Sequence, residues 1–112
     1  MKTDRMRRVD EAVREVLSEA ITREMKDPRL GFVTVTDVDT SADLRHARVY
    51  VSILGEGGVQ RRSLDALTSA HGFLQARVAR ELRIKHTPTL DFVIDDTAEK
   101  AQRVAKLLEE HE

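Results

Sequence analysis

The sequence predicts a small α+β domain in which helices cover one face of a three-stranded sheet. The prediction rests on two observations: helix-type and strand-type hydrophobic patterns alternate along the chain, and its 112 residues suit a single modest core. The predicted order is α-β-β-α(α)-β-α, with an antiparallel hairpin first and a third strand reached by a helical crossover. No repeat, linker or low-complexity tract interrupts it, so we expect one domain over residues 1–112.

The first helix is predicted from Asp4 to Lys26. Its apolar residues recur at steps of three and four and form one buried stripe: Val9, Ala12, Val13, Val16, Leu17, Ala20, Ile21 and Met25. Thr3 or Asp4 is expected to cap its start. Asp10 and Arg14 are expected to pair on the solvent side, since they lie four residues apart. The helix ends at Asp27-Pro28, because proline cannot continue a helix.

Three runs have the composition of β-strands. Phe32–Val38 and Ala47–Ile53 follow Gly31 and are joined by the polar turn Asp39–Arg45, which indicates a hairpin. The second run alternates apolar and polar residues, so one of its faces belongs to the core. The third strand is predicted at Thr89–Asp95, where its inward residues also alternate.

The second helical region is predicted to begin between Val59 and Ser63 and to run to Arg83. Gly72 interrupts its middle, and an interior glycine costs about 1 kcal/mol relative to alanine. We expect a kink at Ala70-His71-Gly72 that divides the region into two helices; the alternative is a glycine that lets another element pack closely. A final helix is predicted to run to Glu110 from a cap at Asp96 or Thr97.

Several segments resemble the ribosome-binding factor A family of bacterial assembly factors. They are Lys26-Asp27-Pro28-Arg29-Leu30-Gly31, the Asp43-Leu44 turn between paired strands, Ala70-His71-Gly72, and Leu82 to Phe92 with its Thr87-Pro88. The resemblance extends from about Arg5 to Leu108. It implies a KH-like fold of type II, αββααβ, in which a helix kink at Ala-x-Gly replaces the Gly-x-x-Gly loop, followed by an extra C-terminal helix.

The resemblance implies a function that is not enzymatic. Members of the family bind the free, immature small (30S) ribosomal subunit, assist 16S rRNA maturation and 5′-end processing, and support cold adaptation. An assembly GTPase is implied to help their release. The competing hypothesis is a protein-interaction module that uses the acidic C-terminal helix or an exposed strand edge. A hydrolase using Asp95 or Asp96 is a distant third.

Basic side chains in the second helical region and at the N-terminus are candidates for binding a phosphate backbone. Arginines step by three beside the apolar stripe, and a lysine extends this patch into the next loop. Such contacts supply affinity without sequence readout. The predicted RNA-binding residues are Arg5, Arg7, Arg8, Arg45, Arg48, Arg77, Arg80, Arg83 and Lys85. The alternative is a solvated helix face, since Glu81 interrupts the patch.

Composition and charge distribution narrow the kinds of site and partner that the chain can have. The net charge is −1, but residues 61–86 hold six basic and two acidic side chains, whereas residues 91–112 hold three basic and seven acidic ones. There is no cysteine, no apolar run approaching the roughly 20 residues of a membrane span, and no histidine spacing typical of a metal site. We expect a cytoplasmic monomer with no catalytic residue, metal, cofactor or membrane partner.

Overall fold

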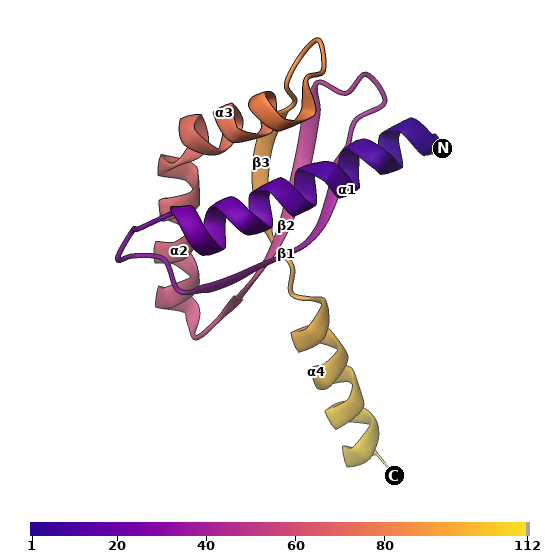
Figure 1. The fold of residues 1–112 in the computed structure, drawn as a ribbon. Helices are drawn as coiled ribbons and strands as arrows, with labels where there is room; N and C mark the ends of the chain where they lie inside the picture. Colours follow the sequence, from indigo (N-terminus) through magenta and orange to yellow (C-terminus); the bar gives the residue numbers. More distant parts are fainter. Residues whose placement is uncertain (112) are drawn as a thin grey trace.

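The computed structural model describes residues 1–111 and has the predicted order of elements (Figure 1). The helical elements are α1 (Asp4–Glu19), the π-helical turn η1 (Ala20–Glu24), α2 (Gly57–Ser69), α3 (His71–Leu82) and α4 (Thr97–Glu110). The strands are β1 (Phe32–Thr40), β2 (His46–Leu54) and β3 (Thr89–Ile94), in the sheet order β1-β2-β3. β1 and β2 are antiparallel and β2 and β3 parallel, which confirms the α+β, KH-like class.

A single core lies between the sheet and the first three helices. The inward residues of β2, such as Val49 and Val51, are fully buried because alternate side chains of a strand share one face. They pack with Leu17 of α1 and with Leu74 and Val78 of α3 in one hydrophobic cluster. This packing fixes α1 and α3 on the same face of the sheet (Figure 1).

The first helix begins where the sequence predicts, but its end and one of its predicted ion pairs differ from the prediction. Thr3 caps α1, because its Oγ1 accepts a hydrogen bond from the Met6 amide at 3.1 Å. The helix ends in η1, two residues before the predicted Lys26. The expected pair of Asp10 and Arg14 is wrong: Asp10 is only 8% exposed, and Arg14 pairs with Glu11. At 100° per residue, Asp10 falls inside the buried stripe of the helix.

The hairpin strands are longer than the sequence pattern predicts. β1 continues to Thr40 and β2 begins at His46, so the turn shrinks to five residues. A bulge at Thr36 shifts the register between Val35 and Asp37. Because the bulge adds one residue, the side chains on either side of it, Val35 and Val38, both face the core.

The connection from α1 to β1 is held by two local devices. The Asp27 carboxylate accepts hydrogen bonds from the side chain and the amide of Arg29, which lower the pKa of Asp27 to about 2. The Gly31 amide donates to Ser63 Oγ at 2.8 Å. A Cβ on Gly31 would lie 2.9 Å from Val59 Cγ1, so the close approach of α2 requires a glycine here.

The second helical region is divided as predicted, and the break lies at Ala70. Its φ of −85° and ψ of 10° leave the helical range between α2 and α3. Gly72 lies in the first turn of α3, where an added Cβ would meet no atom within 4 Å. The surroundings of Gly72 therefore do not require a glycine.

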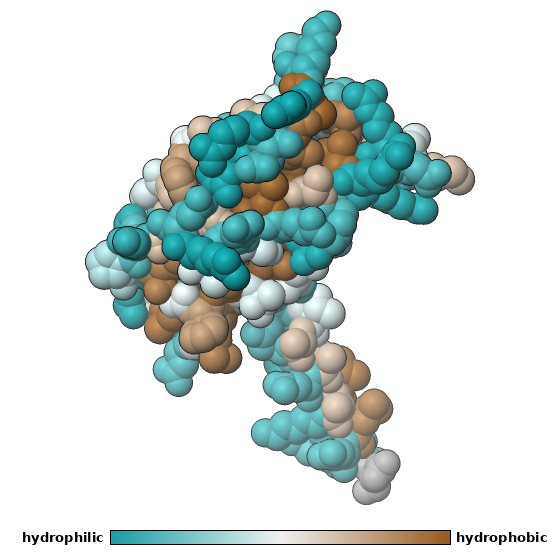
Figure 2. All heavy atoms as spheres, in the orientation of Figure 1, coloured by the Kyte–Doolittle hydropathy of each residue, from teal (hydrophilic) through white to brown (hydrophobic). Residues whose placement is uncertain are grey.

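α4 projects away from the rest of the fold and has no buried residue (Figure 1). Its apolar stripe is exposed: Val104 is 57% exposed, Leu107 53% and Leu108 66% (Figure 2). The expectation that helices cover the sheet therefore does not extend to α4. The N-cap position of α4 is Asp96, as predicted, but the Asp96 side chain makes no capping hydrogen bond; Asp95 Oδ1 accepts the Thr97 amide at 3.0 Å instead. β3 ends one residue early, which leaves Asp95 free to cap.

Candidate nucleic-acid interface

Three segments with basic side chains lie at one end of the molecule (Figure 1). They are the start of α1, the turn between β1 and β2, and the loop between α3 and β3. The turn and the loop are joined directly, since the Thr89 amide donates to the Arg45 carbonyl at 2.8 Å. We call the exposed cations of these segments the basic rim: Arg5, Arg7, Arg8, Arg45, Arg83 and Lys85.

The arginines of α1 point to both sides of its buried stripe. Arg5 and Arg8, three residues apart, lie on one side of the helix, whereas Arg7 lies on the other. Arg7 lines a polar hollow of about 680 Å³ beside β1, together with Asp37 and Asp39. Positive charge in the first turns of a helix opposes its dipole, so these arginines favour a bound anion.

The turn between the hairpin strands fixes the backbone at Arg45. Asp43 Oδ1 accepts hydrogen bonds from Ser41 Oγ at 2.6 Å and from the Arg45 amide at 3.1 Å. These two bonds, the Ser41 bond first, lower the pKa of Asp43 below its ordinary value. Leu44 has a φ of 59°, which is unusual for a residue other than glycine. The turn is therefore tightly determined although it is exposed.

The loop after α3 also begins with a left-handed residue. Arg83 ends the helix with a φ of 50° and a ψ of 35°, where glycine is the usual residue. An L-residue in this conformation costs about 1–2 kcal/mol. The end of the loop is held by Gln75, whose Nε2 donates to the Pro88 carbonyl at 2.6 Å. The chain thus keeps an arginine where a glycine would be easier to accommodate.

The sequence predicted that Arg77, Arg80 and Arg83 lie on one face. In the structure, Arg77 is separated from the other two. Its guanidinium joins α3 to η1, with Nε 2.7 Å from Glu24 Oε2 and Nη1 3.0 Å from Glu81 Oε1. Its side chain is only 11% exposed. Arg80 is exposed on the outer face of α3, and Arg83 lies beyond the end of the helix.

Arg48 lies away from the helices, on the uncovered face of the sheet. Tyr50, Asp91 and Asp39 lie near its guanidinium. The hydrogen bond with Tyr50, and after it the nearby carboxylates, raise the pKa of Arg48. Its charge is therefore partly balanced within the protein.

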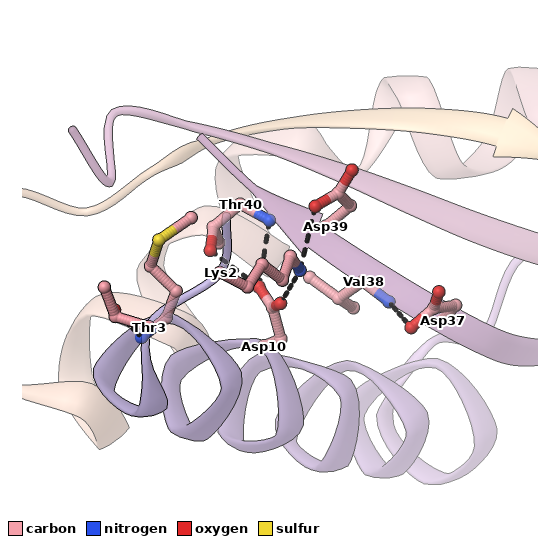
Figure 3. A network of polar contacts seen from close by, with 8 residues as sticks. Lys2, Thr3, Asp10, Asp37, Val38, Asp39 and Thr40 are labelled. Carbon is pink, nitrogen blue, oxygen red and sulfur yellow. Dashed lines mark hydrogen bonds and ion pairs between the residues drawn. The ribbon is translucent and has the colours of Figure 1, made fainter. Parts of the chain in front are cut away.

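A polar network that sequence reasoning missed joins the N-terminus to the end of β1 (Figure 3). Asp10 Oδ1 accepts the Thr40 amide at 2.9 Å and the Thr40 hydroxyl at 2.6 Å. Lys2 Nζ is paired with Asp10 and also with Asp39 Oδ1, the latter at 2.8 Å. Burial lowers the pKa of Lys2, but hydrogen bonds with the two carboxylates outweigh it and raise that pKa overall. The signal available in the sequence was a single acid within the apolar stripe.

Among residues 1–111, no three or more histidine, aspartate or glutamate side chains are grouped so that they could hold a metal ion. The helices of that same range are all too short or too polar to cross a membrane.

A KH-like domain with exposed cations gathered at one end has the architecture of an RNA-binding domain. The family model for ribosome-binding factor A matches residues 5–108, nearly the whole chain. This chain belongs to the ribosome-binding factor A family.

Individual relatives agree with that assignment. Ribosome-binding factor A of Thermomicrobium roseum is 45% identical over 108 residues, which cover 96% of this chain and 84% of the relative. That of Heliobacterium modesticaldum is 43% identical over 112 residues, covering 100% of this chain and 93% of the relative.

Solved structures show the same fold. The crystal structure of ribosome-binding factor A from Thermus thermophilus superposes with a TM-score of 0.71 at 31% identity, covering 80% of this chain and 94% of that one. A homology model of the Thermus factor, fitted into a cryo-electron-microscopy map of its complex with the 30S subunit, gives a TM-score of 0.65 at 32% identity. It covers 77% of this chain and 90% of that one.

Proposed function

We propose that this protein is an assembly factor that binds the free, immature 30S subunit and assists maturation and 5′-end processing of 16S rRNA. Membership of the ribosome-binding factor A family supports this proposal most strongly. The Thermus homologue that shares the fold has been fitted into a map of a 30S complex. Such a factor works where small subunits are assembled, in the cytoplasm, and acts by binding.

The basic rim is the surface we assign to rRNA. Its cations come from three segments that lie at one end of the fold, so one stretch of phosphate backbone can meet several of them. A net charge of −1 is compatible with RNA binding, because affinity depends on the electrostatic field near the binding surface, where the cations gather. Arg80, exposed on α3, extends the surface.

The other two predicted RNA-binding residues have a different assignment. Arg77 is held between Glu24 and Glu81, and contact with RNA would break these pairs. Arg48 faces carboxylates on the uncovered sheet. We assign both to the stability of the fold.

A charge-matched pair of variants tests the rim. The first replaces Arg45, Arg83 and Lys85 by alanine; the second replaces Lys100, Arg103 and Lys106 of α4. Both remove three exposed cations, so their net charges are equal. Each lost phosphate contact lowers the slope of log affinity against log salt by about 0.7–0.9.

We expect the rim variant to lose at least about tenfold in affinity for free 30S subunits. Its slope of log affinity against log salt should be lower by about 2. The α4 variant should bind as the wild type does. Equal losses from both variants would show that only total charge matters, and would contradict the assignment of the rim.

The exposed apolar stripe of α4 favours the second candidate function, a protein-interaction module. The two functions differ in what is bound. If the partner is rRNA, ribonuclease digestion of the subunit abolishes binding and Leu107→Asp leaves it unchanged. If the partner is a protein, binding survives digestion and is lost in that variant.

A further inference from the structure

We propose that Asp10 is a positioning residue of the RNA interface: it fixes the arginines of α1 relative to the turn that presents Arg45. This inference rests on the proposed function, because it concerns how one surface is assembled from two elements. Asp10 itself is buried, so we assign it no direct contact with RNA.

The contacts of Asp10 reach both sides of the basic rim. Thr40, which binds Asp10 through its amide and its hydroxyl, is the last residue of β1 and begins the connection to Arg45. On the other side, Asp10 and Asp39 together hold the ammonium group of Lys2 (Figure 3). The N-terminus, the second turn of α1 and the end of β1 thus meet at one carboxylate.

The carboxylate at this position supplies something that an apolar side chain cannot. Neighbouring positions of the stripe hold Val9, Val13 and Leu17, but an apolar residue at position 10 would leave the buried Thr40 amide and hydroxyl without an acceptor. A buried carboxylate carries a desolvation cost, which its hydrogen bonds and the Lys2 ion pair must offset. What an apolar residue cannot supply is directional bonding to the Thr40 backbone, which sets the register of α1 along β1.

The start of α1 needs such a restraint. Arg5, Arg7 and Arg8 place like charges in the positive end of the helix, which favours fraying. Thr3 caps this end of the helix, and the Lys2–Asp39 and Asp10–Thr40 contacts hold it to β1 in the absence of RNA. The arginines are then already in place when phosphate arrives, so less conformational entropy is lost on binding.

A matched pair of variants separates positioning from charge. Asp10→Asn and Glu11→Gln each neutralise one carboxylate in the same turn of α1, so the net charge changes equally. Glu11 is exposed and pairs with Arg14 only. From charge alone, both variants should bind RNA slightly more tightly.

The measurement is affinity for free 30S subunits at several salt concentrations, with the unfolding midpoint of each variant. We expect Glu11→Gln to bind like the wild type or better. Asn keeps an acceptor for Thr40 but places an amide donor against the Lys2 ammonium, so the hold on the N-terminus is lost. We expect Asp10→Asn to bind about tenfold more weakly, with a salt slope lower by about 1–2, as for the loss of one or two phosphate contacts. A purely structural role would lower the folded fraction and leave the slope of the folded protein unchanged.

Thr40→Val provides the same test without a change of charge, and serves if Asp10→Asn does not fold. It removes the hydroxyl donor while keeping a β-branched side chain in the strand. A reduced salt slope in the folded variant supports the inference. If wild type binds and both variants match Glu11→Gln, the positioning role is refuted while the proposed function stands. If wild type does not bind free 30S subunits, the proposed function fails and this inference with it.

Discussion

Arg77 of α3 and Glu24, the last residue of η1, form an ion pair with Nε and Oε2 2.7 Å apart. The two residues lie 53 positions apart in the sequence, and Glu81 holds the guanidinium from the other side. Arg77 is thereby a link between η1 and α3, whereas Arg80, one turn later, is exposed and can face a ligand.

Replacing Arg77 and Arg80 separately should therefore affect different properties. Arg77→Met should lower the unfolding midpoint by a few degrees, because it removes the link and leaves Glu24 unpaired. Arg80→Ala should leave the midpoint unchanged and weaken binding to 30S subunits by a few-fold. Thermal unfolding and subunit binding of the two variants check this. The reverse pattern would return Arg77 to the RNA interface.

Arg83→Gly should increase stability and decrease binding. Glycine adopts the left-handed conformation of this position without the cost of a side chain, so the free energy of unfolding should rise by about 1 kcal/mol. Loss of a rim cation should at the same time reduce affinity for the subunit. Denaturant unfolding and a binding titration on one preparation measure both effects. Unchanged binding would remove Arg83 from the rim.

Two glycines, Gly31 just before β1 and Gly72 in the first turn of α3, should respond oppositely to alanine. Gly31→Ala should destabilise the protein by about 1–3 kcal/mol, because its Cβ would press on Val59 and Ser63. Gly72→Ala should stabilise it by up to about 1 kcal/mol, since the Cβ enters open space in a helix. Denaturant midpoints test the pair. Strong destabilisation by Gly72→Ala would show that the joint at Ala70 depends on this glycine.

Asp95 makes the attachment of α4 sensitive to acid. Its carboxylate accepts hydrogen bonds from Thr97 and from Thr36, and these lower its pKa below the ordinary value of 3.8. The stabilisation that the ionised Asp95 carboxylate gives to the folded state is therefore fully present above pH 3.8. It is lost as the pH falls through the lower pKa of Asp95 in the folded protein. Nuclear magnetic resonance of the Thr36 and Thr97 amides should show the change below pH 4 in the wild type. Asp95→Asn should show no titration there.

The course of the chain could be predicted because its signals are local. Hydrophobic periods of 3.6 and 2 residues located the helices and strands, and Pro28 and Gly72 indicated where helices stop or bend. Strand ends were underestimated because Asp39 and Thr40 read as polar turn residues, although pairing across the hairpin extends β1 through them. Asp95 was placed at the end of the third strand, and the hydrogen bond by which it caps α4 depends on where that strand ends.

The contents of the site were less predictable because they depend on tertiary contacts. The partners of Arg77 come from another helix, which no spacing within α3 indicates. Asp10 lies within the apolar period of α1, but its charge indicated an exposed side chain. Its burial is explained only by Thr40 at the end of β1, which donates hydrogen bonds to it. The amphipathic period of α4 predicted a helix correctly; the period cannot tell whether the apolar side is covered.

The central claim is tested most directly by co-sedimentation of the purified protein with free 30S subunits, large subunits and joined ribosomes at two salt concentrations. We predict selective binding to free 30S subunits that weakens as salt increases, because the basic rim contacts phosphate. Binding to none of these particles, or equal binding to all three, would contradict the account.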